Sequence, residues 1–208
     1  MQQADNEVYS TLTEIRTLMN RSSRFLNVSA YAPIVAGALA LAAAWVVNRV
    51  FNGGWDIAPM LTVNTRARIY ALLGTAAALV LLCIAATAGL SSLEARRNGT
   101  KITIDAAARR LLWNFFLPLA VGGIFSFSLF VNGHYGLTSS IMLICYGMAL
   151  VSASNHTFSS IRWLGYAELA LGLADSFCQG YALLFWAAGF GVFNILYGIA
   201  LLATRRKR

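Results

Sequence analysis

Residues 181–203 of the chain read YALLFWAAGFGVFNILYGIALLA. An α-helix needs about 20 consecutive apolar residues to cross the hydrocarbon core of a bilayer. This stretch exceeds that length and contains no charged side chain, and the basic tail 204–208 follows it directly. We therefore predict a membrane-spanning helix that ends at a positively charged tail.

Five further segments of the chain are also long and mainly apolar. Together the six segments predict spans at residues 28–51, 69–93, 113–132, 137–156, 161–178 and 181–203. Of the 208 residues, 58% are hydrophobic and only 12% are charged, whereas a soluble domain has about 25% charged residues. This composition excludes a disordered chain, a disulfide scaffold and an ordinary cytosolic enzyme. It predicts an all-α, polytopic membrane bundle of six transmembrane helices across residues 28–203.

The fifth segment, 161–178, is the shortest and contains two acids, so a five-span alternative would leave it as a buried or re-entrant helix. The basic residues separate the two alternatives, because cytoplasmic loops are enriched in Lys and Arg. With a cytoplasmic N-terminus, thirteen of the 16 Lys and Arg residues lie on the inner side, and only Arg49, Arg66 and Arg68 lie on the outer side. This bias predicts that both termini are cytoplasmic. Such a topology requires an even number of spans and favours six.

The formal net charge of +8 is therefore explained by topology rather than by binding of nucleic acid. Basic residues of the inner loop between the second and third spans are candidates for contact with anionic lipid headgroups: Arg96, Arg97, Lys101, Arg109 and Arg110. Each basic residue near an anionic membrane surface contributes roughly 1 kcal/mol to binding. The lipid bilayer is thus the first partner that we expect.

Residues 1–27 precede the first span and place apolar residues at near-helical spacing, including Val8, Leu12, Ile15 and Met19. This spacing predicts a cytoplasmic amphipathic helix. Three roles are open for it: packing under the bundle or on the inner leaflet, a contact between two copies of the chain, and a contact with a partner protein. Basic residues beside the apolar stripe favour the first role.

The first span carries a small residue at every fourth position, at Ala32, Ala36, Ala40 and Ala44. Such a seam lets the backbone of another helix come close. We expect it to serve ordinary packing within the membrane more than the docking of a partner subunit.

Two polar faces occur within the predicted membrane domain. The first lies along the fifth span and just beyond it, and the second lies in the sixth span. They comprise Gly165, Glu168, Gly172, Asp175 and Gln179, and Ala187, Gly191, Asn194 and Gly198, respectively. Residues at steps of three and four share one face of a helix. Only Gln179–Gly180 connects the two spans, so we expect an antiparallel hairpin with Glu168 and Asn194 at similar depth. We therefore predict that the two faces meet and that Glu168 is able to form a hydrogen bond with Asn194.

Glu168 is the most informative residue of this region, because a charged carboxylate near the bilayer centre costs roughly 2.5–3.5 kcal/mol on insertion scales. The side chain must be protonated, paired or in contact with a water-filled cavity. Two interpretations are open: a protonatable or ion-coordinating group in a substrate path, or a neutral acid that is hydrogen-bonded to Asn194. Asp175, Asn194, Tyr146 and His156 complete the set of candidate ligand or ion residues. Asp175, near the outer end of its helix, is expected to reach interfacial water.

Motifs of metal-dependent or covalent catalysis are absent from the sequence. His134 and His156 lie at opposite ends of the fourth span, too far apart to share a metal ion, and the three cysteines fall inside apolar segments. No Gly-x-Ser-x-Gly, His-Glu-x-x-His or phosphate-binding glycine loop occurs. We therefore predict neither an enzyme nor a bound metal or cofactor.

The segment directly before the first span, residues 14–26, reads EIRTLMNRSSRFL. It resembles a family of uncharacterised bacterial multi-pass membrane proteins. The resemblance is specific over roughly the first 45 residues and only compositional beyond them. It implies a location in the bacterial inner membrane and no established activity.

The leading hypothesis from the sequence is a six-span bundle that binds or moves a small solute or ion, with Glu168 at its polar centre. The alternative is a membrane scaffold or sensor that contacts a partner through residues 1–27 and the basic inner face. Assembly with a second copy or with a partner membrane protein is open in both. A water-filled pocket at Glu168 would favour solute binding, and a dry, filled bundle would favour the scaffold.

Overall fold

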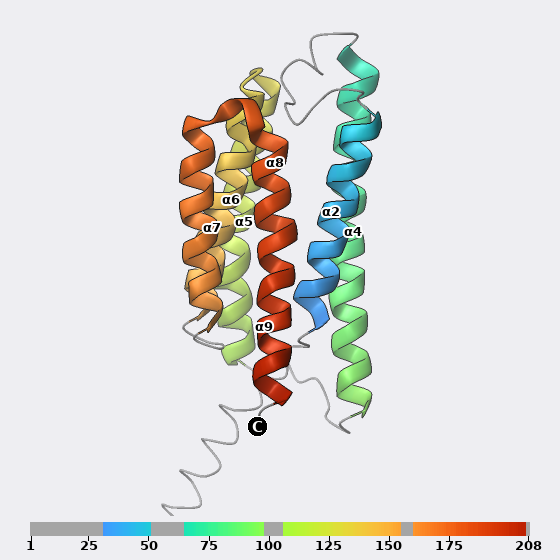
Figure 1. Ribbon diagram of the computed structural model, residues 1–208, viewed down its shortest axis with the longest axis vertical. Coiled ribbons are helices and arrows are strands. Elements are labelled where there is room, and N and C mark those ends of the chain that lie inside the picture. The colour runs from blue at the N-terminus through green and yellow to red at the C-terminus, as the bar shows by residue number, and fades with distance from the viewer. Residues whose placement is uncertain (1–30, 51–64, 98–105, 155–159, 207–208) are drawn as a thin grey trace, which may run out of the picture.

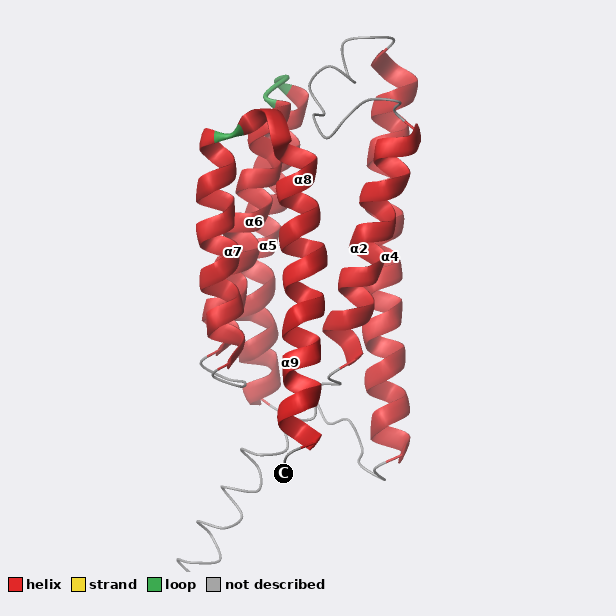
Figure 2. Cartoon of the chain, in the orientation of Figure 1, coloured by secondary structure: helices red, strands yellow, loops and turns green. Residues whose placement is uncertain are grey.

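The computed structural model describes residues 31–50, 65–97, 106–154 and 160–206. Within these residues no strand is present, and Figure 2 shows the helices as one bundle, with the loops drawn in green at one end. The prediction of an all-α fold is confirmed for this part of the chain. The amphipathic helix predicted at residues 1–27 lies outside it.

The described helices overlap the six apolar segments predicted from the sequence. They are α2 (Tyr31–Val50), α4 (Thr65–Arg97), α5 (Ala106–Val131), α6 (Tyr135–Ser154) and α7 (Ser160–Phe177), followed by η1 (Gln179–Tyr181), α8 (Ala182–Trp186), the π-helix η2 (Ala187–Phe193) and α9 (Asn194–Arg206). In Figure 1 the last three of these form one continuous rod, which we call the C-terminal helix. It spans residues 182–206.

Helix direction alternates along the chain, as the colours of Figure 1 show. α2, α5 and α7 run one way, and α4, α6 and the C-terminal helix run the other way. One end of the bundle therefore carries most of the described arginines, namely Arg96, Arg97, Arg109, Arg110, Arg162, Arg205 and Arg206, and the opposite end carries Arg49, Arg66 and Arg68. We call these the basic end and the opposite end.

Small residues bring the helix backbones of the bundle together, as is usual for helices packed within a membrane. α6 meets α7 where a Cβ atom added to Gly147 would lie 2.8 Å from the carbonyl oxygen of Gly165. α5 meets α6 where Gly122 lies directly against Cys145. α6 is thus packed between α5 and α7.

α2 joins α4 to the rest of the bundle. A Cβ atom added to Gly37 of α2 would lie 2.6 Å from the carbonyl oxygen of Gly191 in the C-terminal helix. Within the predicted alanine seam, Ala40 and Ala44 are buried, and Ala44 packs in an apolar cluster with Leu183. The seam therefore takes part in packing within the chain.

The bundle is apolar on its outside and carries acids inside. Ile124, Trp163 and Phe177 are 73%, 75% and 88% exposed, whereas Glu168 and Asp175 are 0% exposed. Among the described residues, four helices are long and apolar enough to cross a membrane, and α4 contains the shorter apolar stretch Gly74–Thr87. The four are Tyr31–Arg49, Arg109–Val131, Tyr135–Ser154 and Ala182–Thr204. This distribution is typical of a helical membrane protein.

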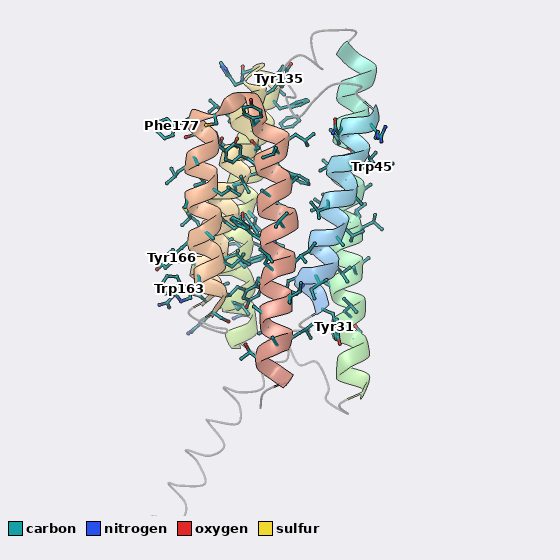
Figure 3. All side chains as sticks on the ribbon, in the orientation of Figure 1. Tyr31, Trp45, Tyr135, Trp163, Tyr166 and Phe177 are labelled. Atoms are coloured by element: carbon teal, nitrogen blue, oxygen red, sulfur yellow. The ribbon has the colours of Figure 1, made fainter. Side chains whose placement is uncertain are left out.

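The aromatic side chains labelled in Figure 3 lie in two separate parts of the bundle. Tyr31, Trp163 and Tyr166 lie toward the basic end, and Trp45, Tyr135 and Phe177 lie in the opposite half. The guanidinium carbon of Arg49 lies 5.6 Å from the centre of the Trp45 ring. Trp and Tyr are enriched at both interfaces of a membrane with water, so this arrangement agrees with a bilayer around the bundle.

Candidate functional site

The polar face of α7 is turned toward α6. Glu168 lies in the middle of this face, between Gly165 and Gly172, whose added Cβ atoms would lie 2.9 Å from the Gly147 carbonyl oxygen and 2.9 Å from Leu143 Cβ. The prediction that the glycines of this face meet the sixth span is therefore wrong. Because α6 offers a glycine of its own at the crossing, the two backbones approach most closely there.

The carboxyl group of Glu168 reaches past α6 to the C-terminal helix at Gly189. A Cβ atom added to Gly189 would lie 2.5 Å from Oε2 of Glu168 and 3.2 Å from Leu171 Cδ2, and would touch Leu143. Neither carboxyl oxygen of Glu168 has a hydrogen-bond partner within the described residues. The absence of a side chain at Gly189 is what leaves room for this carboxyl group.

Asn194 makes its hydrogen bonds elsewhere, so the predicted bond between Glu168 and Asn194 is wrong. Nδ2 of Asn194 donates to the carbonyl oxygens of Gly189 and Phe190, both at 3.3 Å. Both carbonyl groups belong to the π-helix η2, which ends immediately before Asn194. The amide side chain thus pairs with the backbone of its own helix. Turns of π-helix are rare and are frequently found at functional sites.

Tyr146 of α6 completes this arrangement. Its Oη donates to Oδ1 of Asn194 at 2.8 Å, and its ring stacks on Phe190 with centroids 4.9 Å apart and planes inclined by 29°. Trp186 lies 5.3 Å from the same Phe190 ring. A polar and aromatic bridge therefore connects α6 with the C-terminal helix beside the Glu168 carboxyl group.

Removal of the tyrosine hydroxyl is expected to weaken this bridge measurably. Tyr146→Phe leaves Oδ1 of Asn194 without its donor, and Asn194 is only 5% exposed. Leaving a buried acceptor unpaired costs about 1–3 kcal/mol, which we expect as a lower free energy of unfolding in detergent. Tyr166→Phe is the matched control, because Tyr166 is 46% exposed on α7. Equal stability of the two variants would contradict the role of the Tyr146 hydroxyl.

Asp175 lies farther along the same face of α7, toward the opposite end. Its Oδ2 accepts hydrogen bonds from the hydroxyl groups of Ser139 and Ser140 in α6, the second at 2.9 Å. The expectation that Asp175 reaches interfacial water is wrong, because its side chain is 0% exposed. The first turns of α6 cover it.

Sequence reasoning missed Ser139, Ser140 and Gly189. The two serines carried a signal, because adjacent hydroxyl groups interrupt an otherwise apolar segment near the end of the bundle that holds Asp175. Gly189 carried none, since it is one of 17 glycines and nothing in its neighbourhood along the chain points to Glu168.

The remaining polar candidates lie away from this centre or outside the described residues. His134 is exposed in the turn between α5 and α6, and His156 is not among the described residues. Near the basic end, Nε of Arg162 donates to Oγ of Ser154 at 3.0 Å. In the described ranges no group of three or more His, Cys, Asp or Glu is placed to hold a metal ion. The chemistry available at the centre is that of carboxyl, hydroxyl and amide groups.

The candidate lipid-contacting residues lie at the basic end. Arg109 and Arg110 are exposed at the start of α5 and, with Trp113 and Asn114, line an open pocket of about 410 Å³. Arg96 and Arg97 form the end of α4, and Lys101 lies outside the described residues. Two guanidinium groups beside a tryptophan suit the headgroup region of an anionic lipid.

No protein-family model, curated protein or solved structure matches this chain. The resemblance of residues 14–26 to bacterial multi-pass membrane proteins therefore stays a hypothesis. The function has to be argued from the buried centre and the surface of the bundle.

Proposed function

We propose that this chain is an integral protein of the bacterial inner membrane, with six spans and both termini on the cytoplasmic side. The apolar exterior and the four long apolar helices support a membrane location. The alternating helix directions and the arginines gathered at one end support the orientation. With 18 residues, α7 extends about 27 Å at 1.5 Å per residue, which is close to the thickness of a bilayer core.

At the centre of this bundle we place a site that binds or moves a small solute or ion, with Glu168 as the protonatable or ion-coordinating group. The observation that carries the proposal is the pair of buried carboxyl oxygens without partners. An ionised group there carries a large desolvation cost, so the carboxyl group holds its proton until another cation balances the charge. An acid kept for structural reasons would make hydrogen bonds, and Glu168 makes none within the described residues.

A membrane scaffold or sensor is the second candidate. The close enclosure of Glu168 by Leu143, Leu171 and Gly189 is the dry packing that such a protein needs. An apolar side chain would fill this space at lower cost than an unpaired carboxyl group, however, because a buried polar group without a partner is destabilising. The dry enclosure thus supports the scaffold, whereas the unpaired carboxyl oxygens support the binding site, and we give the second observation more weight.

The test compares the purified wild-type chain with Glu168→Gln in mild detergent. Thermal unfolding of both is followed from about pH 5 to about pH 8 against a panel of ions, lipids and small metabolites. A ligand at about 100 times its dissociation constant stabilises the folded state by roughly 2.7 kcal/mol. We expect such a ligand to stabilise the wild type but not the Glu168→Gln variant. The variant is expected to fold, because the substitution removes no hydrogen bond of Glu168.

Glu94→Gln, the same exchange near the end of α4, is the matched control and is expected to keep the response. Equal stabilisation of wild type and Glu168→Gln by the same ligand would remove Glu168 from the site. If no member of the panel shifts the wild type, the scaffold becomes the better hypothesis.

A further inference from the structure

Asp175 is a second buried acid that the proposed site at Glu168 does not use. The two residues are seven positions apart on α7, which is about 10 Å along the helix axis. Oδ2 of Asp175 accepts two hydrogen bonds from α6, whereas Oδ1 is buried and has no partner within the described residues. Asp175 therefore has one buried carboxyl oxygen that makes no hydrogen bond within the described residues.

The hydroxyl oxygens of Ser139 and Ser140, which are hydrogen-bonded to Asp175, can serve as further ligands. A serine hydroxyl has one hydrogen and two lone pairs, and the hydroxyl hydrogens of Ser139 and Ser140 are both donated to Asp175. The lone pairs of both hydroxyl oxygens are left for another ligand. Hydroxyl and carboxylate oxygens are the ligands that hard cations prefer.

We propose that Asp175, Ser139 and Ser140 form a binding site for a monovalent hard cation such as Na⁺. One carboxylate balances a single positive charge, and the two donated hydrogen bonds stabilise the negative charge on Oδ2. A divalent ion would leave an uncompensated charge inside the bundle, which is costly. Transition metals are disfavoured because they select imidazole or thiolate ligands, and the three ligating groups here are all oxygens.

The site is separated from Glu168 by direct contact between α6 and α7. One turn closer to Glu168, a Cβ atom added to Gly172 would lie 2.9 Å from Leu143 Cβ and 3.0 Å from the backbone nitrogen of Ile144. In the other direction α7 ends at Phe177, only two residues beyond Asp175. The cation therefore enters from the opposite end of the bundle, and its binding does not depend on the group at Glu168.

The experiment measures thermal unfolding of the purified full-length chain in detergent while NaCl replaces choline chloride at constant ionic strength. We expect a saturable rise in Tm with NaCl and none with choline chloride, and a smaller rise with KCl. Asp175→Asn is expected to abolish the rise. Glu168→Gln is expected to keep it, so failure of this proposal and failure of the proposed function give different results.

A second variant protects the test against a misfolded Asp175→Asn chain. The double variant Ser139→Ala, Ser140→Ala is expected to need about tenfold more NaCl, or still more, for the half-maximal shift in Tm. Each substitution removes one hydroxyl ligand of the cation and weakens binding by the energy of a charge-assisted contact. Ser128→Ala, at an exposed serine of α5, is the control and is expected to leave that concentration unchanged. Absence of a Na⁺-specific shift in the wild type, or an unchanged half-maximal concentration in the double variant, would overturn the proposal.

Discussion

Gly147→Leu is expected to separate α6 from α7 and to lower the free energy of unfolding. Overpacking typically costs about 1–3 kcal/mol, and we expect a loss at or above the upper end of this range. A Cβ atom at this position would lie 2.8 Å from the Gly165 carbonyl oxygen and 2.9 Å from the backbone nitrogen of Leu169. Backbone atoms cannot rotate away as the tip of a side chain can, so the helices themselves must move. Chemical unfolding in detergent measures the loss.

Gly123→Leu on α5 is the matched control for this prediction. No atom lies within 4 Å of a Cβ atom added to Gly123, so leucine there is expected to face lipid without loss of stability. The Gly147→Leu chain is also expected to lose any Na⁺-dependent rise in Tm, because Asp175 and its serines lie across the same interface. If the two variants unfolded alike, the close crossing of α6 and α7 would be disproved.

Gly37→Leu is expected to detach α2 from the C-terminal helix. The added side chain would meet the Gly191 carbonyl oxygen at 2.6 Å and the Ile195 backbone nitrogen at 3.1 Å, both measured from its Cβ atom. We expect a destabilisation of the same order as for overpacking elsewhere, about 1–3 kcal/mol. A thiol introduced by Ala44→Cys reports the detachment, because Ala44 is 2% exposed in the wild type. Maleimide should label it only after Gly37→Leu is added.

The control for this experiment is Gly74→Leu on α4, where no atom lies within 4 Å of the added Cβ atom. It is expected to leave the thiol at position 44 protected. Labelling is compared with the chain without Ala44→Cys, which gives the background from the native cysteines. Continued protection in the Gly37→Leu chain would show that α2 is held by other contacts.

The positions of the helices were predictable from the sequence because the hydrocarbon core sets the length of an apolar segment. The uninterrupted residues 181–203 predicted the C-terminal helix directly. The charge pattern went further, since the arginines predicted for the inner side all lie at the basic end wherever they are described. These properties depend on local composition, which a single sequence contains.

The partners of each helix face were not predictable in the same way. Gly165 and Gly172 were expected to face the sixth span because a short turn connects it to the fifth. A short turn fixes that two helices are neighbours, but it does not fix how far each one is rotated about its own axis. The glycine face of α7 packs instead against α6, which contributes Gly147 to the crossing.

The centre itself depends on backbone geometry that the sequence does not reveal. η2 is a π-helix of seven residues, and its wider turns decide which side chains of the C-terminal helix point toward α6. Asn194 was expected at the depth of Glu168 and within reach of it, yet its side chain is hydrogen-bonded to Tyr146 and to the backbone of its own helix. The sequence shows which polar residues share a helix face, whereas their hydrogen-bond partners depend on how the helices pack.

The crossing at Gly37 and Gly191 has a consequence for biosynthesis. These residues are about 150 positions apart, and a ribosome that adds about 5–20 residues per second needs on the order of 10–30 s to make the chain between them. During that interval the C-terminal helix does not yet cover the glycine and alanine face of α2. The C-terminal helix, made after α2, then covers α2 through Gly191 and the carboxyl group of Glu168 through Gly189. One late docking event thus both joins the two parts of the bundle and encloses its central acid.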